Sequence, residues 1–402
     1  MTVQAARRIA RLPDQMFARL VQQVEARRRQ GIEVINLGQG NPDQPTPAHI
    51  VTALQSAAND PRLHRYISFK GLDTLKRTVG QWYQAKHGVI LDPEREIAIL
   101  IGSKIGLQEI SLCLLNPGDV AMVPDPGYPD YWSGIQLAGG KMVPWRLHPD
   151  NNFLPDLSEW HADARLAFVN YPNNPTGRIA PEAFYTDLIR QADRHGTIVA
   201  HDLAYGDIVY DGQRASSLLS HPGGKAVGVE FTTLSKSYNM AGWRIGFAAG
   251  NAEVIALIER LQDHLHCSQF GAIQEAAITA LSGPQESVVA LRRTFQDRRD
   301  RFIATAQANG WNVPPSQGSI FLWCPVPKHT TSMAWAERLL AEENIVVAPG
   351  SGFGSSGEGY VRISLTESTD RLELAAQRLA HVLASPTPRL HEVTQSGNIT
   401  PH

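Results

Sequence analysis

The residues best suited to chemistry lie between Thr233 and Arg244, where the sequence reads Thr-Leu-Ser-Lys-Ser-Tyr-Asn-Met-Ala-Gly-Trp-Arg. Lys236 stands between two serines, and Arg244 follows eight residues later. A lysine amine can form a Schiff base with an aldehyde, and a guanidinium binds a phosphate through two parallel hydrogen bonds. The segment therefore indicates a site that holds a phosphorylated cofactor covalently. Taken alone, it would equally suit a turn with a surface lysine and arginine.

Two further polar motifs argue against a simple surface turn, because each follows an apolar run typical of a buried strand. Asn174 lies in Tyr-Pro-Asn-Asn-Pro-Thr-Gly, which is also a good turn sequence. Asp202 lies in His-Asp-Leu-Ala-Tyr-Gly, three residues before Tyr205. We expect these side chains to join Lys236 in one site.

The elements that would position these residues alternate along the first 250 residues. Helical periodicity is found at 14–30, 106–115 and 181–194, and again throughout 251–309. This alternation predicts an α/β fold with a mostly parallel sheet covered on both faces. Such sheets bind ligands at the carboxyl ends of their strands, where the polar motifs fall. The predicted strands are 96–102, 120–124, 141–147, 165–171, 197–201, 229–234 and 245–249.

The C-terminal third changes character. Short strands are predicted at 321–324, 345–348 and 360–365, with helices between and after them. This pattern predicts a second, smaller α+β domain. Residues 385–402 are rich in turn formers and lack apolar periodicity, so we expect a flexible tail.

Composition excludes several classes of protein. The 402 residues include 43% hydrophobic and 19% charged residues, and the formal net charge of −2 argues against a nucleic-acid partner. No apolar run is long enough for a membrane span, and no secretory signal is found, so a cytoplasmic location is expected. The three cysteines and fourteen histidines show no metal-ligand spacing, and no metal site is predicted.

Five motifs in a common order, from about residue 35 to about residue 365, resemble those of class I/II aminotransferases of the pyridoxal phosphate (PLP) fold type I superfamily. The resemblance implies a large domain with a mostly parallel seven-stranded sheet and a smaller α+β domain. It further implies a homodimer with shared active sites. The expected units are an N-terminal arm at 1–47 that packs with the small domain, a large PLP-binding domain at 48–290, a small domain at 291–384 and the tail at 385–402.

The resemblance also implies a role for each residue. Lys236 would bind PLP and move the substrate's proton, and Asp202 would pair with the pyridine nitrogen. Asn174 and Tyr205 would donate hydrogen bonds to the phenolic oxygen, and Tyr128 would stack on the ring. The remaining residues would hold the phosphate, namely Arg244, Ser235, Thr233, the turn Gly102, Ser103 and Lys104 at a helix N-terminus, and Tyr66 from the neighbouring subunit.

Arg362 would bind the substrate's α-carboxylate, with Gly40 and Asn174 beside it. Residues 34–47, 123–134 and 238–244 most resemble the glutamine transaminases of bacterial methionine salvage. The expected reaction is therefore amino transfer from glutamine to 2-keto-4-methylthiobutyrate, or to a similar apolar or aromatic keto acid. Phe17, Tyr66 and Phe270 could line the pocket for its side chain.

Other readings stay open, because the same cofactor residues serve several reactions. Gly271 stands where those glutamine transaminases carry an arginine, which weakens the transfer of their substrate to this chain. Aspartate, alanine and LL-diaminopimelate aminotransferases would use the same constellation, as would a carbon–sulfur lyase. A PLP-binding transcriptional regulator is disfavoured, because no DNA-binding module is expected before residue 35.

Overall fold

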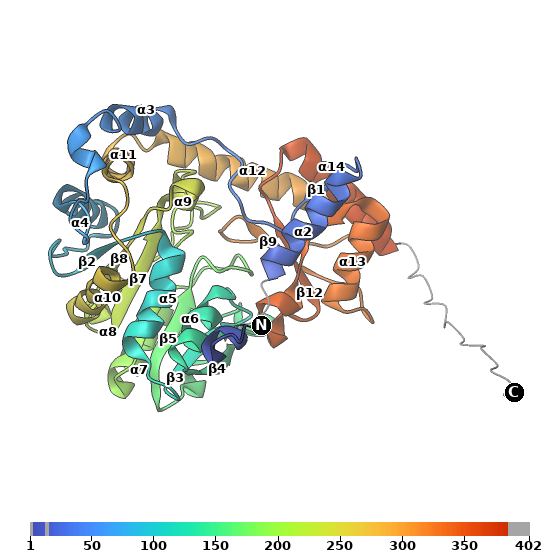
Figure 1. Cartoon of the computed structure of the whole chain (residues 1–402). Coiled ribbons are helices and arrows are strands. Elements are labelled where there is room, and N and C mark those ends of the chain that lie inside the picture. Colours follow the sequence, from blue (N-terminus) through green and yellow to red (C-terminus); the bar gives the residue numbers. More distant parts are fainter. Residues whose placement is uncertain (1–2, 13–15, 385–402) are drawn as a thin grey trace, which may run out of the picture.

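The computed structural model describes residues 3–12 and 16–384, and Figure 1 shows it as two groups of elements joined by a long helix. The predicted tail at 385–402 and the first two residues of the helix predicted at 14–30 lie outside the described residues. No helix among the described residues is long and apolar enough to cross a membrane. The α-helices are α1 (Arg7–Ala10), α2 (Met16–Arg29), α3 (Ala48–Ala57), α4 (Asp73–His87), α5 (Ser103–Leu114), α6 (Asp130–Ala138), α7 (Glu182–His195), α8 (Gly224–Val227), α9 (Leu234–Ser237), α10 (Ala252–Leu265), α11 (Gly271–Ser282), α12 (Glu286–Ala308), α13 (Ser332–Glu343) and α14 (Thr369–Ala384).

A seven-stranded sheet forms the centre of the larger group, and its order is β2-β8-β7-β6-β5-β3-β4. All seven predicted strands are present within a few residues of their expected bounds. Only β8 runs against the others, since it is antiparallel to both β2 and β7. The predicted α/β fold with a mostly parallel sheet is confirmed. The strands are β2 (Ile97–Leu100), β3 (Val120–Asp125), β4 (Lys141–Arg146), β5 (Ala164–Asn170), β6 (Ile198–Asp202), β7 (Gly228–Thr233) and β8 (Gly246–Gly250).

Helices cover both faces of this sheet, as the alternation predicted. On one face, apolar side chains of α5, α6 and α10 form a buried cluster with β3, β5 and β7. On the other face, α7 packs on β5 and β6, while α4 and α11 cover β2 and β8. Because both faces are buried, the strands read as nearly continuous apolar runs, and this is why they could be found in the sequence.

The second group of elements combines distant parts of the chain. Strand β1 (Ile35–Asn36) pairs in parallel with β10 (Ile345–Val346), while β11 (Ala348–Pro349), β12 (Tyr360–Ser364) and β9 (Phe321–Pro325) form an antiparallel sheet. The prediction of a single strand at 345–348 is therefore wrong. It is divided at Val347 because its first half bonds to the N-terminal segment and its second half to β12.

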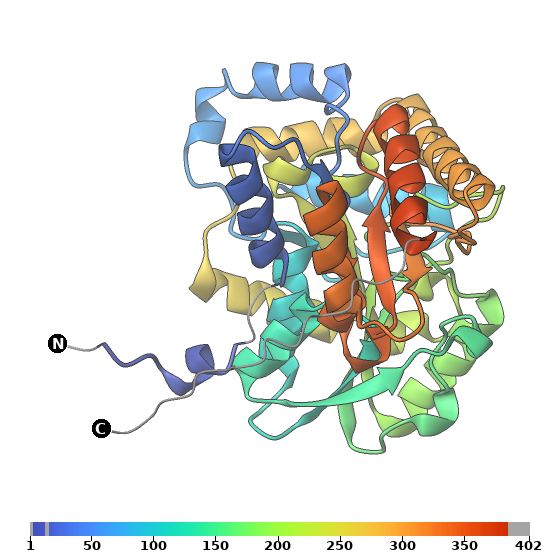
Figure 2. The ribbon, with the colours of Figure 1, turned by 90° about the vertical axis from the view of Figure 1, so that its right-hand side faces the viewer.

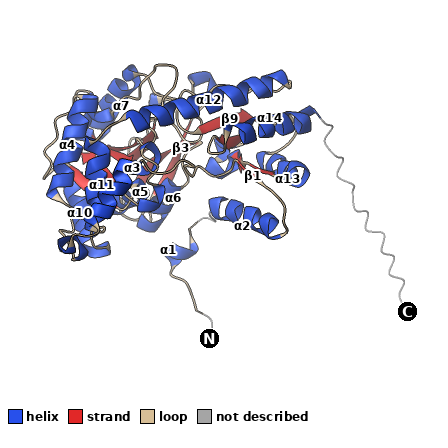
Figure 3. Ribbon diagram, turned by 90° about the horizontal axis from the view of Figure 1, so that it is seen from above, coloured by secondary structure: helices blue, strands red, loops and turns tan. Residues whose placement is uncertain are grey.

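Helices α2, α13 and α14 lie around these small sheets, and Figure 2 shows α2 and α13 beside one another although over 300 residues separate them. The helical region predicted at 251–309 consists of three helices, α10, α11 and α12. Seen from above in Figure 3, α12 runs from the large sheet toward the small ones. The exact domain boundaries stay a prediction.

Candidate functional site

A cavity of about 560 Å³ opens at the carboxyl ends of the central strands. Asp202 ends β6, Thr233 ends β7, and Ser103 begins the helix after β2. Segment 39–41 and side chains from β9 and β12 enclose the opposite side. The cavity is lined by Phe17, Gln39, Gly40, Asn41, Ser103, Lys104, Leu107, Tyr128, Asn174, Asp202, Ala204, Tyr205, Thr233, Ser235, Lys236, Ala241, Arg244, Phe321 and Arg362.

Lys236 extends into this cavity from the one-turn helix α9, whose N-terminus is capped by the side chain of Thr233. Its Nζ donates a hydrogen bond to the carbonyl oxygen of Gly40 at 2.6 Å. Burial, together with the charges of Arg362 and Arg244, lowers the pKa of Lys236 to about 8. A substantial fraction of this amine is therefore neutral near physiological pH, as a nucleophile or base requires.

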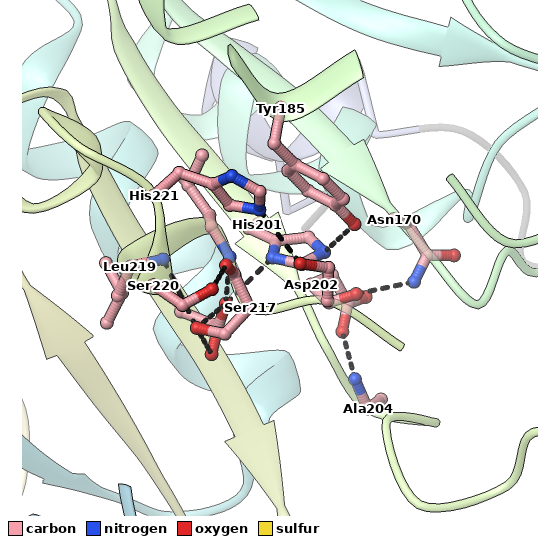
Figure 4. A network of polar contacts seen from close by, with 12 residues as sticks. Asn170, Tyr185, His201, Asp202, Ala204, Ser217, Leu219, Ser220 and His221 are labelled. Atoms are coloured by element: carbon pink, nitrogen blue, oxygen red, sulfur yellow. Dashed lines mark hydrogen bonds and ion pairs between the residues drawn. The ribbon is translucent and has the colours of Figure 1, made fainter. Parts of the chain in front are cut away.

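Asp202 lines the same cavity as Lys236, and its carboxylate is buried. Oδ2 accepts a hydrogen bond from the Tyr131 hydroxyl at 2.7 Å, and Oδ1 accepts one from the backbone N–H of Ala204 at 3.3 Å. Asn170 donates to the Asp202 carbonyl at 2.7 Å, as Figure 4 shows. Burial raises the pKa of Asp202, although the hydrogen bond from Tyr131 opposes this effect. Asp202 forms no ion pair with another described residue, although the nearby charge of Lys236 acts to lower its pKa, so its carboxylate is suited to a cationic ligand.

Behind Asp202, the neighbouring residue His201 is fully buried and points into a second polar network (Figure 4). Its Nδ1 lies 2.9 Å from Glu230 Oε2, and these residues are direct partners in the β6–β7 register. Glu230 also accepts hydrogen bonds from Tyr83 and Ser217. These contacts tie β6 to β7 and so fix the strand ends that carry Asp202 and the segment leading to Lys236.

At the other end of the cavity, Arg244 and the N-terminus of α5 converge. Gly102 has φ 78°, and a Cβ at this position would lie 2.3 Å from Nη2 of Arg244, so another residue would strain the backbone and displace the guanidinium. No side chain caps α5, whose first backbone N–H groups are those of Ser103 and Lys104. The Thr233 hydroxyl donates to Ser235 Oγ at 2.8 Å. This end presents the donors that an anion requires.

Arg362 lies buried between the large and small sheets. Its Nη1 donates to Asn174 Oδ1 at 2.9 Å and its Nη2 to the Gly38 carbonyl at 2.8 Å, while Nε has no hydrogen-bond partner. Three phenylalanine rings surround the guanidinium, with centroids at 3.9, 4.8 and 5.0 Å from Cζ, those of Phe321, Phe353 and Phe17 respectively. Burial lowers the pKa of Arg362 to about 10.

The structure thus places most of the predicted site residues around one cavity. Gly102 lies directly behind it, against Arg244. Tyr66 lies outside it with 85% of its surface exposed, and its predicted contact with a neighbouring subunit stays a prediction. Phe17 lines the cavity, whereas Phe270 does not and is exposed.

The sequence placed Phe17 in the expected substrate pocket, but it did not predict Tyr131 or the other two phenylalanines around Arg362, Phe321 and Phe353. Tyr131 follows Tyr128 by three residues, a spacing that places two aromatic side chains near one another at the start of a helix. That spacing alone could have marked Tyr131 as a neighbour of the site. Phe321 and Phe353 carry no local signal, because only the pairing of β9, β11 and β12 brings them to Arg362.

Residues 32–379 match the sequence model of the family described as aminotransferase class I and II. The chain belongs to this family. L-glutamine--4-(methylsulfanyl)-2-oxobutanoate aminotransferase of Bacillus subtilis (strain 168) is 49% identical over 372 residues, which cover 92% of this chain and 94% of that one. LL-diaminopimelate aminotransferase of Moorella thermoacetica is 45% identical over 385 residues, with 95% and 99% covered.

Among solved structures, the substrate-bound BacF structure from Bacillus subtilis superimposes with a TM-score of 0.91 at 39% identity and covers 95% of this chain and 98% of that chain. The match confirms the fold expected of an aminotransferase. The chain is therefore an aminotransferase, and the cavity around Lys236 and Arg362 is its candidate active site.

Proposed function

We propose that this aminotransferase binds PLP in the cavity that contains Lys236. Members of the class I and II family generally depend on this cofactor, and the residues present fit it. The buried Asp202 carboxylate, which forms no ion pair with another described residue, suits a protonated pyridine nitrogen, and Lys236 suits the aldehyde. Arg244, Ser235, Thr233 and the N-terminus of α5 would hold the phosphate.

When bound, PLP supplies an electron sink for the negative charge that develops at the substrate's α-carbon. The side chains of this protein would orient the substrate and move its proton. Arg362 would orient the substrate through its α-carboxylate, with Asn174 and Gly40 beside it. Lys236 would take the proton from the α-carbon, since its lowered pKa leaves a neutral amine to act as base. Tyr205, Asn174 and Tyr128 would hold the cofactor in place from the sides.

The proposed substrates are glutamine as donor and 2-keto-4-methylthiobutyrate, or a similar apolar or aromatic keto acid, as acceptor. The printed name of the Bacillus subtilis relative supports this choice. The cavity wall supports it too, because Phe17 and Phe321 offer apolar surface near Arg362. Lys104 is a cation in the cavity wall that could bind a distal carboxylate of a substrate. Its Nζ already lies 2.9 Å from Oδ1 of Asp130. LL-diaminopimelate is the second candidate, because the Moorella relative is nearly as similar.

We further propose a homodimer whose partner completes the site. Tyr66 is 85% exposed, and further large apolar side chains near it in sequence or space are exposed as well. Phe69 follows three residues later, and the Phe270 ring lies 6.1 Å from that of His64. An exposed surface of this kind is typical of a contact between protein chains. In the dimer, Tyr66 would reach the phosphate of the neighbouring subunit.

The single observation that carries the proposal is the shared cavity of Lys236, Asp202 and Arg362. Borohydride treatment of the purified enzyme, followed by peptide mass mapping, should find the reduced cofactor on the peptide that contains Lys236. Lys236→Ala should lose this label and the transaminase activity, whereas Lys141→Ala, at an exposed position on β4, should keep both. A label on another peptide would refute the assignment.

A panel of single amino acids tests the substrates. Mixing the enzyme with one amino acid at a time, and following the conversion of the cofactor to its aminated form, should give the highest efficiency with glutamine and with methionine-like or aromatic amino acids. Highest efficiency with LL-diaminopimelate or aspartate would overturn the substrate proposal and leave the cofactor assignment intact. Release of ammonia and a keto acid without any acceptor would instead indicate a lyase.

A further inference from the structure

A second cavity, of about 270 Å³, lies under helix α2 and apart from the carboxyl ends of the large sheet. Its walls come from Met16, Phe17 and Leu20 of α2 and from Met333, Ala336 and Leu340 of α13. Trp132 of α6 and the segment from Val346 to Gly352 close the remaining sides. Figure 2 shows how α2 and α13 lie side by side there.

The character of these walls specifies the chemistry of a ligand. The polar side chains at the cavity, Arg19, Gln23, Glu337 and Ser351, are all exposed and therefore belong to its mouth. The deeper walls are apolar, and two methionines, Met16 and the half-exposed Met333, have flexible side chains that adapt to different shapes. A dry apolar cavity of about 150 Å³ already holds a benzene molecule. A cavity of 270 Å³ has room for an uncharged bicyclic aromatic molecule.

Phe17 links this cavity to the active site, because its side chain lines both. Its ring centroid lies 5.0 Å from Cζ of Arg362 and meets the Phe353 ring edge-on at 6.0 Å. The first turn of α2 thus rests on the hollow on one side and on the carboxylate-binding arginine on the other. A molecule that fills the hollow would support Phe17 in its place against Arg362.

We propose that the cavity under α2 is a second binding site for an uncharged, bicyclic aromatic ligand, and that its occupation strengthens carboxylate binding at Arg362. Coupling of this kind is reciprocal, so a carboxylate at Arg362 must strengthen binding of the aromatic ligand by the same factor. The site does not require the proposed substrates, only the carboxylate that every amino acid and keto acid carries.

Indole is a suitable probe, and its binding to the cofactor-loaded enzyme can be measured by isothermal titration calorimetry. The unreactive carboxylate 3-phenylpropanoate, which has neither an amino nor a keto group, reports on Arg362. We expect indole to tighten the binding of 3-phenylpropanoate about fivefold or more. Unchanged affinity, or competition between the two molecules, would overturn the proposal.

Two variants locate the indole site. Ala336→Leu adds three carbons inside the cavity, and Ala334→Leu makes the same change on the exposed face of the same helix. Ala336→Leu should abolish indole binding and its effect on 3-phenylpropanoate, while Ala334→Leu should keep both. If Ala336→Leu does not fold, Met333→Trp at the half-exposed edge of the cavity replaces it. Indole binding that survives the filling variant would refute the site.

Discussion

The hydroxyl of Tyr131 lies 2.7 Å from Oδ2 of Asp202, and both groups are buried beneath the candidate active site. This hydrogen bond favours the ionised form of a carboxylate whose pKa is raised by burial. Tyr131→Phe should therefore weaken the hold of Asp202 on the cofactor. A hydrogen bond to a charged group contributes about 1.5–3 kcal/mol, so we expect cofactor affinity to fall about tenfold or more.

Equilibrium dialysis of the cofactor measures that affinity. Tyr171→Phe is the matched control, because the Tyr171 hydroxyl is also buried and donates at 2.7 Å, but to the Phe153 carbonyl away from the cavity. It should leave cofactor affinity unchanged. Equal losses in both variants would show that Tyr131 acts only through general stability.

The reaction of Lys236 with added cofactor should depend on pH. An amine attacks an aldehyde only when neutral, and the pKa of Lys236 is lowered to about 8. The rate of cofactor capture by the cofactor-free protein should therefore rise between pH 7 and pH 9, with its midpoint near 8. Because the charge of Arg362 contributes to this lowering, Arg362→Leu should move the midpoint upward, whereas the exposed Arg293→Leu should not.

Arg362→Lys should raise KM for both amino and keto substrates. A lysine cannot reproduce the planar fork of a guanidinium, nor can it stack in the same way against Phe321. We expect an increase of about tenfold or more, which steady-state kinetics with varied substrate would measure. An effect confined to kcat, with KM unchanged, would argue against a carboxylate-binding role.

Phe17→Arg should change the substrate preference. Phe17 lines the cavity beside Arg362 and contributes apolar surface. A guanidinium at this position would offer a partner to a distal carboxylate, so the ratio of kcat/KM for aspartate to that for methionine should rise about tenfold or more. Phe17→Leu, which keeps the apolar character, should leave this ratio near its wild-type value.

Mixing two defective variants tests the proposed shared site. Tyr66→Ala and Lys236→Ala would each impair both sites of a homodimer. If Tyr66 serves the neighbouring subunit, each mixed dimer carries one intact site. Refolding an equal mixture should then restore about a quarter of the wild-type sites, measured as activity. No recovery in a mixture shown to contain mixed dimers would mean that Tyr66 does not act across the interface.

The sequence predicted the large sheet well and the small sheets less well. Buried parallel strands can be recognised in the sequence as apolar runs. The polar residues at their carboxyl ends, such as Asn174 and Asp202, could therefore be predicted together with the strands. Nothing in the local sequence indicates that the strand predicted at 345–348 is divided at Val347. This division depends on pairing with Ile35, 310 residues earlier, which only the folded chain reveals.

The same distinction holds within the site. Lys236, Asp202 and Arg244 belong to short motifs with a chemical purpose, so residue type and spacing predicted them together. Phe17 was expected in the substrate pocket, but Phe321 and Phe353, which complete the cage around Arg362, were not, because a phenylalanine in an apolar stretch resembles any other core residue. Long-range packing, rather than motif chemistry, decided which ones face the guanidinium.

The continuous segment that contains β10 and β11 has an implication for recombining this chain with its relatives. Five consecutive residues, Ile345 to Pro349, bond first to the strand that leads into Gly38 and Gly40 and then to the strand that bears Arg362. Residues 35–36 and 345–364, which are distant in the sequence, therefore form one structural unit. A chimera that takes β1 from a relative without β10, β11 and β12 would pair strands from two different proteins, so the natural crossover unit is divided along the chain but continuous in space.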